Sequence, residues 1–316
     1  MKKVLILIVI ILLCYIDPDW ASSAKAKRHA NERGIHTISK KTNQENKVEL
    51  LPNIVYAKAG STFLKMHLLV PKQSTIPHPL IIFIKGGGWG DKHPQRVLRF
   101  IPQLVRFAQS GYVVASIEHR TSHMAQFPAQ LYDVKAAIRY LKAHADQFNI
   151  DAKKVGVWGS SSGGHLAALI GTSGDVPQLE GEEGDLRQSS RVQAVVDWYG
   201  PTDFLQMSKF PSKVDFDGPD SPESKLIGGP IQENKDKVKL ANPITYITSN
   251  DPPFLIMHGD KDMRVPYNQS VLLYTALKKA KVQVAMYKIK GAGHGGFTQP
   301  EIMDTVLQFF DNHLKH

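Results

Sequence analysis

The strongest chemical signal in this chain is the segment 159–163, whose residues GSSSG fit the pattern G-x-S-x-G. An apolar stretch, 155–158, comes directly before it, and a stretch with helical spacing, 165–170, follows it. A strand–turn–helix of this kind requires small flanking residues and holds its central side chain out above the sheet. We therefore predict that Ser161 is a nucleophile. The helix after it would turn its positive N-terminal end toward negative charge that develops nearby.

A serine hydroxyl becomes a useful nucleophile when a base takes its proton and a third group orients that base. His294 lies in the glycine-rich loop 291–296, after the last predicted strand, while Asp260 and Asp262 follow the predicted strand 254–257. The carboxyl ends of parallel strands commonly carry sites, and the chain order serine, acid, histidine is that of α/β-hydrolases. Either aspartate could instead cap a turn, and the residues alone do not separate the two. An exposed loop histidine is the alternative for His294, since the chain has 13 histidines.

Three glycines at 86–88 directly follow the predicted strand 80–84 and lie between Lys85 and Trp89. Consecutive glycines reach backbone angles that other residues avoid, and their N–H groups can bind an oxyanion. A flexible turn is the alternative, but α/β-hydrolases build their oxyanion hole after the third strand. Trp89 either offers a stacking face to substrate or packs in the core.

From about residue 48 the sequence alternates strand-like and helix-like segments, which predicts an α/β fold with a mostly parallel central sheet flanked by helices. The predicted strands are 63–70, 80–84, 113–117, 155–158, 194–198, 254–257 and 282–289, and the predicted helices are 96–109, 130–147, 165–170, 267–279 and 301–313. The alternation stops between 203 and 251, where Pro, Gly, Ser and charged residues dominate. This segment is either a functional insertion such as a cap over a site or a surface excursion. One catalytic domain, 48–316, is expected.

The N-terminus has the pattern of a secretory signal peptide. Two lysines precede the apolar stretch 4–16, and small residues follow at 21–24. We expect a signal peptide over 1–24 and a polar, basic linker over 25–47, hence a secreted or periplasmic protein. A retained membrane tether is the alternative, although the apolar stretch is shorter than the roughly 20 residues that span a bilayer. The single cysteine, Cys14, lies in this stretch, so the processed chain would have no disulfide and no thiolate metal site.

The formal net charge of +10 is consistent with a solvated basic surface or with attraction to an anionic polymer. No nucleic-acid-binding motif is present, and no basic stripe alternates with aromatic residues, so we expect no nucleic-acid partner. The chemistry predicted above also needs no metal and no organic cofactor.

The chain resembles the secreted esterase branch of the α/β-hydrolases, similar to feruloyl, acetyl-xylan and related carbohydrate esterases (BD-FAE-like). The segments that carry this resemblance are GGGWGDK (86–92), FPAQLYDVKAAIRYL (127–141), VGVWGSSSGGHLAAL (155–169), SPESKLIGG (221–229), PPFLIMHGDKDMRVP (252–266) and GAGHGG (291–296).

This resemblance implies an α/β-hydrolase fold and a Ser-Asp-His triad in which the acid is Asp262, with Asp260 as its neighbour in the turn. It also implies an oxyanion hole formed by the backbone N–H groups of Gly87, Gly88 and Ser162. Lys85 departs from the pattern, because the family usually has a histidine that helps to hold the glycine loop by hydrogen bonding. Lys85 must therefore either extend into solvent or find a new partner.

These features together predict a secreted serine esterase. Its substrate would be a small or polysaccharide ester that carries an acetyl or feruloyl group. An amidase or peptidase on the same fold and a catalytically inactive carbohydrate-binding protein are the alternatives. Lys85 is the only feature that favours the inactive protein.

Overall fold

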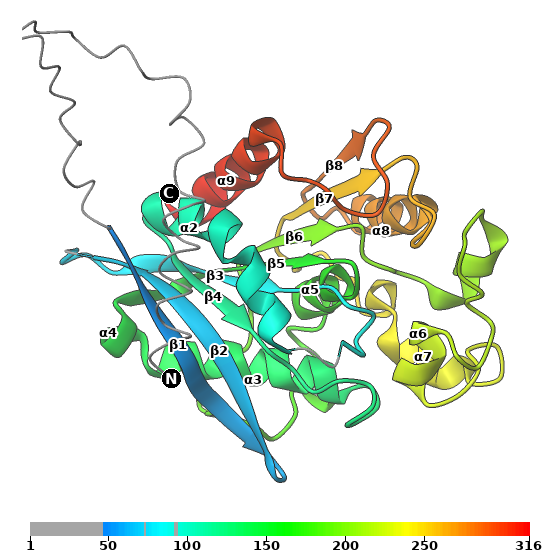
Figure 1. The fold of residues 1–316 in the computed structure, drawn as a ribbon, viewed down its shortest axis with the longest axis horizontal. Coiled ribbons are helices and arrows are strands. Elements are labelled where there is room, and N and C mark those ends of the chain that lie inside the picture. The colour runs from blue at the N-terminus through cyan, green and yellow to red at the C-terminus, as the bar shows by residue number, and fades with distance from the viewer. Residues whose placement is uncertain (1–46, 73, 92–93) are drawn as a thin grey trace, which may run out of the picture.

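The computed structural model describes residues 47–72, 74–91 and 94–316, so the predicted signal peptide 1–24 and nearly all of the linker 25–47 lie outside the described residues. The described chain forms one eight-stranded sheet with the strand order β1-β2-β4-β3-β5-β6-β7-β8 (Figure 1). The strands are β1 (Val48–Ala59), β2 (Thr62–Pro71), β3 (His78–Ile84), β4 (Val113–Ile117), β5 (Ile150–Ser160), β6 (Ala194–Trp198), β7 (Phe254–Gly259) and β8 (Val284–Ile289). The pairs β1–β2 and β2–β4 are antiparallel and all other neighbours are parallel, which is the predicted α/β-hydrolase architecture.

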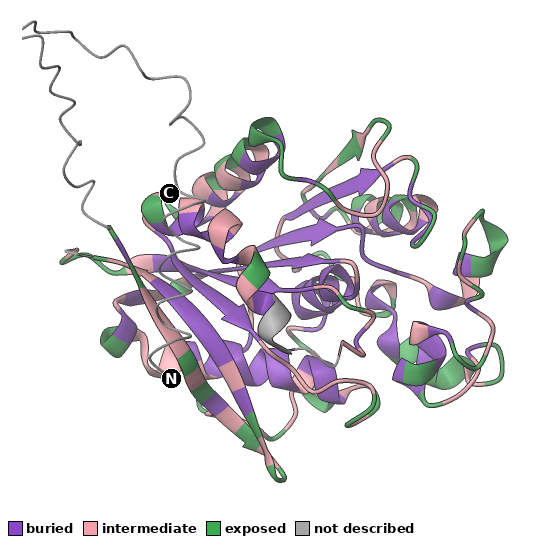
Figure 2. Ribbon diagram, viewed as in Figure 1, coloured by how far each residue is buried: buried purple, intermediate pink, exposed green. Residues whose placement is uncertain are grey.

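Helices cover both faces of the sheet, as expected when parallel strands are apolar along their whole length. Strand β3 illustrates this: Leu80, Ile82 and Ile84 belong to one buried cluster, whereas Ile81 and Phe83 belong to the other. The first cluster includes α3 (Ala129–Ala143), α4 (Ala145–Phe148), α5 (Ser162–Thr172) and α8 (Asn268–Lys279), and the second includes α2 (Ile101–Gln109) and α9 (Pro300–Leu314). Figure 2 shows the resulting buried centre, with the strands enclosed between these helices.

The structure adds one strand, β1, and divides two of the predicted helices. Strand β1 was not among the predicted strands; it contains Pro52 and is an edge strand with a register shift between Leu51 and Ile54, where proline is tolerated. The predicted helix 96–109 is a 3₁₀ helix, η1 (Pro94–Phe100), followed by α2, because Pro102 is compatible only with the first turn of an α-helix. The predicted helix 130–147 is divided between α3 and α4.

The segment 203–251 contains short helices rather than irregular chain: η3 (Phe204–Lys209), α6 (Pro222–Ile227), α7 (Lys235–Ala241) and η4 (Pro243–Thr245). Its buried side chains, among them Phe204, Phe216 and Leu226, are part of the first core cluster. The segment is therefore anchored in the domain core and is more than a surface excursion. Figure 1 shows α6 and α7 beyond the ends of the central strands.

One further short element, the 3₁₀ helix η2 (Pro177–Leu179), lies in the connection between α5 and β6. Ion pairs fasten this connection to α3, with Glu180 bound by both Lys135 and Arg139. In the described part of the chain, no helix combines the length and hydropathy needed to cross a membrane.

Candidate active site

Ser161 occupies a sharp turn between β5 and α5. Its backbone angles, φ 55° and ψ −124°, lie in a region that non-glycine residues rarely adopt, and its N–H donates to the carbonyl of Trp198 at 2.8 Å. The turn depends on Gly163, because a Cβ there would collide with the carbonyl oxygen of Ile84. The sequence G-x-S-x-G thus lets α5 pack directly on the end of β3 and presents the Ser161 side chain above the sheet.

The structure brings Ser161, His294 and Asp262 together in one hydrogen-bonded chain. The Oγ atom of Ser161 lies 2.9 Å from Nε2 of His294, and Nδ1 of His294 lies 2.7 Å from Oδ2 of Asp262. A carboxylate only accepts hydrogen bonds, so Nδ1 carries the proton and Nε2 presents its lone pair to the serine hydroxyl. These residues come from three different loops at the carboxyl ends of β5, β7 and β8.

The Asp262 side chain is fully buried but surrounded by donors. Oδ1 accepts the backbone N–H groups of Arg264 and Val265 at 2.8 and 3.0 Å, and Nε2 of His258 lies 3.2 Å from Oδ2. Burial alone would raise the pKa of this carboxyl group, but the hydrogen bonds from His258 and His294 outweigh burial and hold the pKa well below its usual range. The group is therefore an anion throughout the neutral range.

Asp260, the other aspartate considered from the sequence, accepts the N–H of Gly291 at 2.7 Å, whereas His294 is bonded to Asp262. Asp260 ties the β7 turn to the loop that carries His294. This placement agrees with the turn role that the resemblance implied.

The glycine loop after β3 lies against the serine turn. A Cβ on Gly86 would be 3.0 Å from Cβ of Ser161, and the Gly86 N–H points to Oγ of Ser160 at 3.3 Å. Gly87 and Gly88 have φ values of 142° and 60°, which residues other than glycine rarely adopt. Ser162 is the first residue of α5, where a backbone N–H has no partner within the helix. Ser162 thus adjoins Ser161 directly, and Gly86 brings the glycine loop against the serine turn.

Lys85 does find a partner, since its Nζ atom lies 2.9 Å from Oδ2 of Asp91. The two side chains are 9% and 8% exposed. Because Lys85 precedes the glycine loop and Asp91 follows it, this ion pair joins the two ends of the loop. A buried charge pair thus stands where the resemblance predicted a histidine.

Trp89 is 2% exposed, and its ring packs against His165 and Phe204. Its Nε1–H donates to Nδ1 of His165 at 3.2 Å, and Nε2 of His165 bonds the carbonyl of Ala241 at 2.7 Å. This favours the packed tryptophan over the stacking face that the sequence left open. Trp89 connects the glycine loop to α5 and to the segment 203–251.

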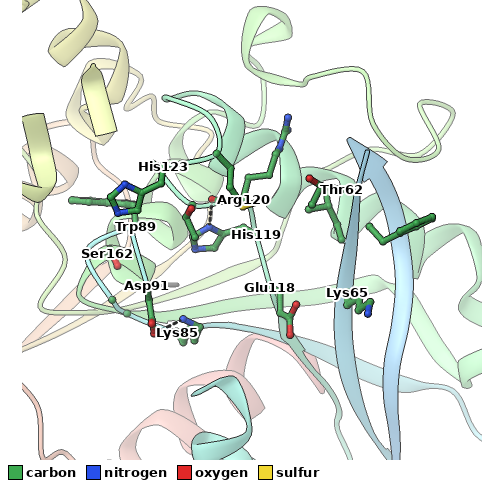
Figure 3. Close-up of a pocket in the computed structure, with 16 residues that line it drawn as sticks. Thr62, Lys65, Lys85, Trp89, Asp91, Glu118, His119, Arg120, His123 and Ser162 are labelled. Carbon is green, nitrogen blue, oxygen red and sulfur yellow. Dashed lines mark hydrogen bonds and ion pairs between the residues drawn. The ribbon is translucent and has the colours of Figure 1, made fainter. Parts of the chain in front are cut away.

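A cavity of about 520 Å³ lies next to the glycine loop (Figure 3). Gly86, Gly87 and Ser162 form part of its wall, whereas Ser161, Asp262 and His294 do not line it. Lys85, Trp89 and Asp91 of the same loop also line it. The remaining wall comes from the β1–β2 hairpin and the segment after β4, and includes Phe63, Lys65, Glu118, His119 and Met124. Since β4 and β2 lie on the other side of β3 from β5, the cavity extends away from His294.

Three residues at the site were not singled out from the sequence. Tyr199 packs edge-on against His294 with ring centroids 4.7 Å apart, Ser160 bonds the glycine loop, and His258 contacts Asp262. Burial raises the pKa of Tyr199 to about 12, so its hydroxyl stays protonated. The position of Tyr199 directly after β6, at the same edge of the sheet as Ser161, is the signal that could have identified it. Among the described residues, no group of three or more His, Cys, Asp or Glu side chains is arranged to hold a metal ion.

Residues 66–277 match the BD-FAE family model, which covers most of the chain. The chain belongs to the BD-FAE family. The matched region includes Ser161 and Asp262 but ends before His294, so the place of His294 in the site rests on its hydrogen bonds.

Similar proteins carry esterase names. The chain is 35% identical over 222 residues to Esterase LipC of Mycobacterium tuberculosis, an alignment that covers 70% of this chain and 54% of LipC. A solved truncated carbohydrate esterase from gut microbiota has 34% identity and a TM-score of 0.77, over 86% of this chain and 99% of that one. The esterase Est2 of Thermogutta terrifontis has 27% identity and a TM-score of 0.68, over 85% and 93% of the two chains. The BD-FAE chain described here spans about half the length of the curated relatives it matches.

Proposed function

We propose that this protein is an exported serine esterase that removes an acyl group from a carbohydrate or small ester, with Ser161, His294 and Asp262 as its catalytic residues. The observation that carries the proposal is the pair of hydrogen bonds, 2.9 and 2.7 Å long, that connects these three side chains. The positive φ of Ser161 supports it, since this strained turn exposes the hydroxyl.

Acylation begins when Nε2 of His294 takes the proton of Ser161 as Oγ attacks the ester carbonyl carbon. The imidazolium that forms is stabilised by the buried Asp262 carboxylate, whose lowered pKa keeps it ionised. His294 then gives the proton to the leaving alcohol oxygen. Water, activated by His294 in the same way, attacks the acyl-serine and releases the acid.

The negative charge of the tetrahedral intermediate would lie between the glycine loop and α5. The N–H groups of Gly87, Gly88 and Ser162 are the proposed donors, each contributing roughly 3 kcal/mol by comparison with similar sites. The helix dipole of α5 acts in the same direction. Neither a metal ion nor an organic cofactor is part of this mechanism.

The cavity is the proposed binding site of the acyl group. It borders Gly87 and Ser162 but extends away from His294, which must contact the leaving oxygen. Its volume, about 520 Å³, lies within the range of about 300–1,000 Å³ for small-molecule sites and exceeds what an acetyl group needs. This volume is large enough for an acyl group the size of feruloyl as well as for acetyl. The carbohydrate part of the proposed substrate rests on the carbohydrate esterase among the similar structures. The proposal of export rests on the sequence of residues 1–24 alone.

The test is the hydrolysis of p-nitrophenyl acetate and methyl ferulate by wild-type protein, the Ser161→Ala variant and a control variant, Ser189→Ala, at an exposed serine. We expect turnover by the wild type and the control and loss of both activities in Ser161→Ala. Full activity in Ser161→Ala would refute the assignment of the nucleophile. Faster cleavage of a p-nitroanilide than of the matching ester would favour the amidase. Polysaccharide binding without any hydrolysis would favour the inactive binding protein.

A further inference from the structure

His258 lies at the end of β7, behind the proposed catalytic acid, and is completely buried. Its Nε2 atom is 3.2 Å from Oδ2 of Asp262 and 3.0 Å from the carbonyl oxygen of Val265. Both neighbours are acceptors, so Nε2 must carry the proton. On the other side of the ring, Nδ1 lies 2.7 Å from Oγ of Ser270 in α8, and it accepts the hydroxyl proton.

We propose that His258, held by Ser270, is a positioning residue that directs its Nε2–H at Asp262 and thereby sets how strongly Asp262 holds the proton of His294. This inference rests on the proposed function, because it concerns the same hydrogen-bonded chain. His258 does not touch Ser161 or the substrate, and it acts only through the carboxylate.

The physical reason is the sharing of one carboxylate oxygen. Oδ2 accepts from His294 at 2.7 Å and from His258 at 3.2 Å, while Oδ1 accepts from the backbone of Arg264 and Val265. Each donor disperses negative charge from the carboxylate. Removal of the His258 donor concentrates that charge on the oxygen that faces His294, so His294 holds its second proton more tightly and is a poorer base at low pH.

Other titratable groups near this chain do not compensate for such a change. The rings of Tyr199 and Tyr267 pack against His258, with centroids 6.2 and 5.6 Å away, and Tyr199 also packs against His294. Burial raises the pKa of both tyrosines, so they remain neutral. Asp260, in the same turn, is bonded to the backbone of Gly291. Arg264 contributes its backbone N–H.

The experiment compares two substitutions of the same residue. His258→Leu fills the volume without a donor, whereas His258→Gln can place an amide N–H near the position of Nε2. We expect His258→Leu to lower kcat/KM for p-nitrophenyl acetate about tenfold. This is the lower end of the roughly 10–100-fold loss seen when a residue that orients a metal ligand is removed, which is a comparable indirect role. The acidic limb of the kcat/KM profile of His258→Leu should move to higher pH by on the order of half a unit. His258→Gln should restore most of both properties.

A second readout does not depend on turnover. The Nδ1 proton of His294, in its short hydrogen bond to Asp262, should give a far-downfield proton resonance. This resonance should shift in His258→Leu and return toward the wild-type position in His258→Gln. If Ser161→Ala kept its activity, the proposed function would fail, yet this resonance would still report on the contact between His258 and Asp262.

Two results overturn the inference. One is a pH profile and a downfield resonance in His258→Leu that match the wild type. The other is a His258→Gln variant as impaired as His258→Leu, which would make the role of the ring one of packing alone. If His258→Leu does not fold, Ser270→Ala decides, since it removes one hydroxyl and weakens the His258 donor. A smaller shift in the same direction supports the inference, and wild-type values overturn it.

Discussion

The ion pair between Lys85 and Asp91 gives the sharpest test of how the glycine loop is held. Lys85→Met keeps most of the side-chain length and removes the charge from a contact whose two sides are 9% and 8% exposed. Removing one partner of a buried ion pair costs about 3–5 kcal/mol where the charge left behind has no other partner. Both side chains line the 520 Å³ cavity, through which water can reach the carboxylate. Asp91 also has an interaction besides the one with Lys85, so we expect a smaller loss, about 2 kcal/mol in the free energy of unfolding, as for one hydrogen bond to a charged group.

The chain offers a matched control in Lys225→Met. Lys225 forms an ion pair with Asp220 at 3.2 Å, but its two sides are 42% and 95% exposed. Exposed pairs of this kind contribute little, because solvent screens them. The control should unfold at the same urea concentration as the wild type, while Lys85→Met should unfold at a clearly lower one.

Activity provides the second half of the test. Loss of one oxyanion donor lowers kcat by about 10²–10³ in comparable sites. Lys85 positions the loop and donates nothing to the oxyanion, so we expect a smaller loss in Lys85→Met, about tenfold in kcat for p-nitrophenyl acetate. The reasoning is refuted if Lys85→Met is as stable and as active as Lys225→Met. Lys85→His with unchanged activity would show, in addition, that the lysine itself takes no part in the reaction.

Two further predictions concern the cavity and the buried ring contact behind it. Phe63, 57% exposed at the cavity wall, should contact a large acyl group; we expect Phe63→Ala to raise KM for methyl ferulate relative to p-nitrophenyl acetate by about fivefold, as suits the loss of one aromatic contact. Tyr287→Ala, at an exposed tyrosine of β8, is the control, and an unchanged KM ratio in Phe63→Ala would place the acyl group elsewhere. Burial lowers the pKa of His165 to about 4, so between pH 6.5 and 4 the unfolded chain binds a proton that the folded chain does not, and this contribution to stability is lost as the pH falls. In urea unfolding, the wild type should therefore lose more stability than His165→Gln over this interval, by up to roughly 1.4 kcal/mol per pH unit. If the unfolding free energies of the two proteins fall in parallel with pH, His165 is not the neutral partner of Trp89.

The sequence predicts the buried strands and the site residues that directly follow them. Strands 80–84, 113–117 and 194–198 are buried throughout because helices cover both of their faces, and all three end where they were predicted to end. Residues that directly follow such strands must meet at one edge of the sheet. Ser161 and His294 could be found for this reason, although their spacing in the sequence is large.

Side-chain contacts between different elements were not predictable in this way. His258 reads as the end of an apolar strand, and nothing in its neighbourhood marks the contact with Ser270, 12 residues further on in α8. Ser160 looks like a small residue in a tight turn, yet its hydroxyl accepts from Gly86. These partners depend on side-chain directions and on the distance between loops, which a pattern of residue types does not contain.

The glycine loop illustrates how a missing residue can be replaced by a set of contacts. The resemblance predicted a histidine before the glycines, and its absence was the one feature that favoured an inactive protein. In the structure, the Lys85 pair closes the loop at its two ends, Ser160 accepts the N–H of Gly86, and Trp89 bonds His165. Pro222 of α6 also faces Gly88, because a Cβ on that glycine would lie 3.2 Å from the proline. Since these contacts come from different elements, loss of one of them should weaken the loop without releasing it, and Lys85 therefore gives little reason to expect an inactive site.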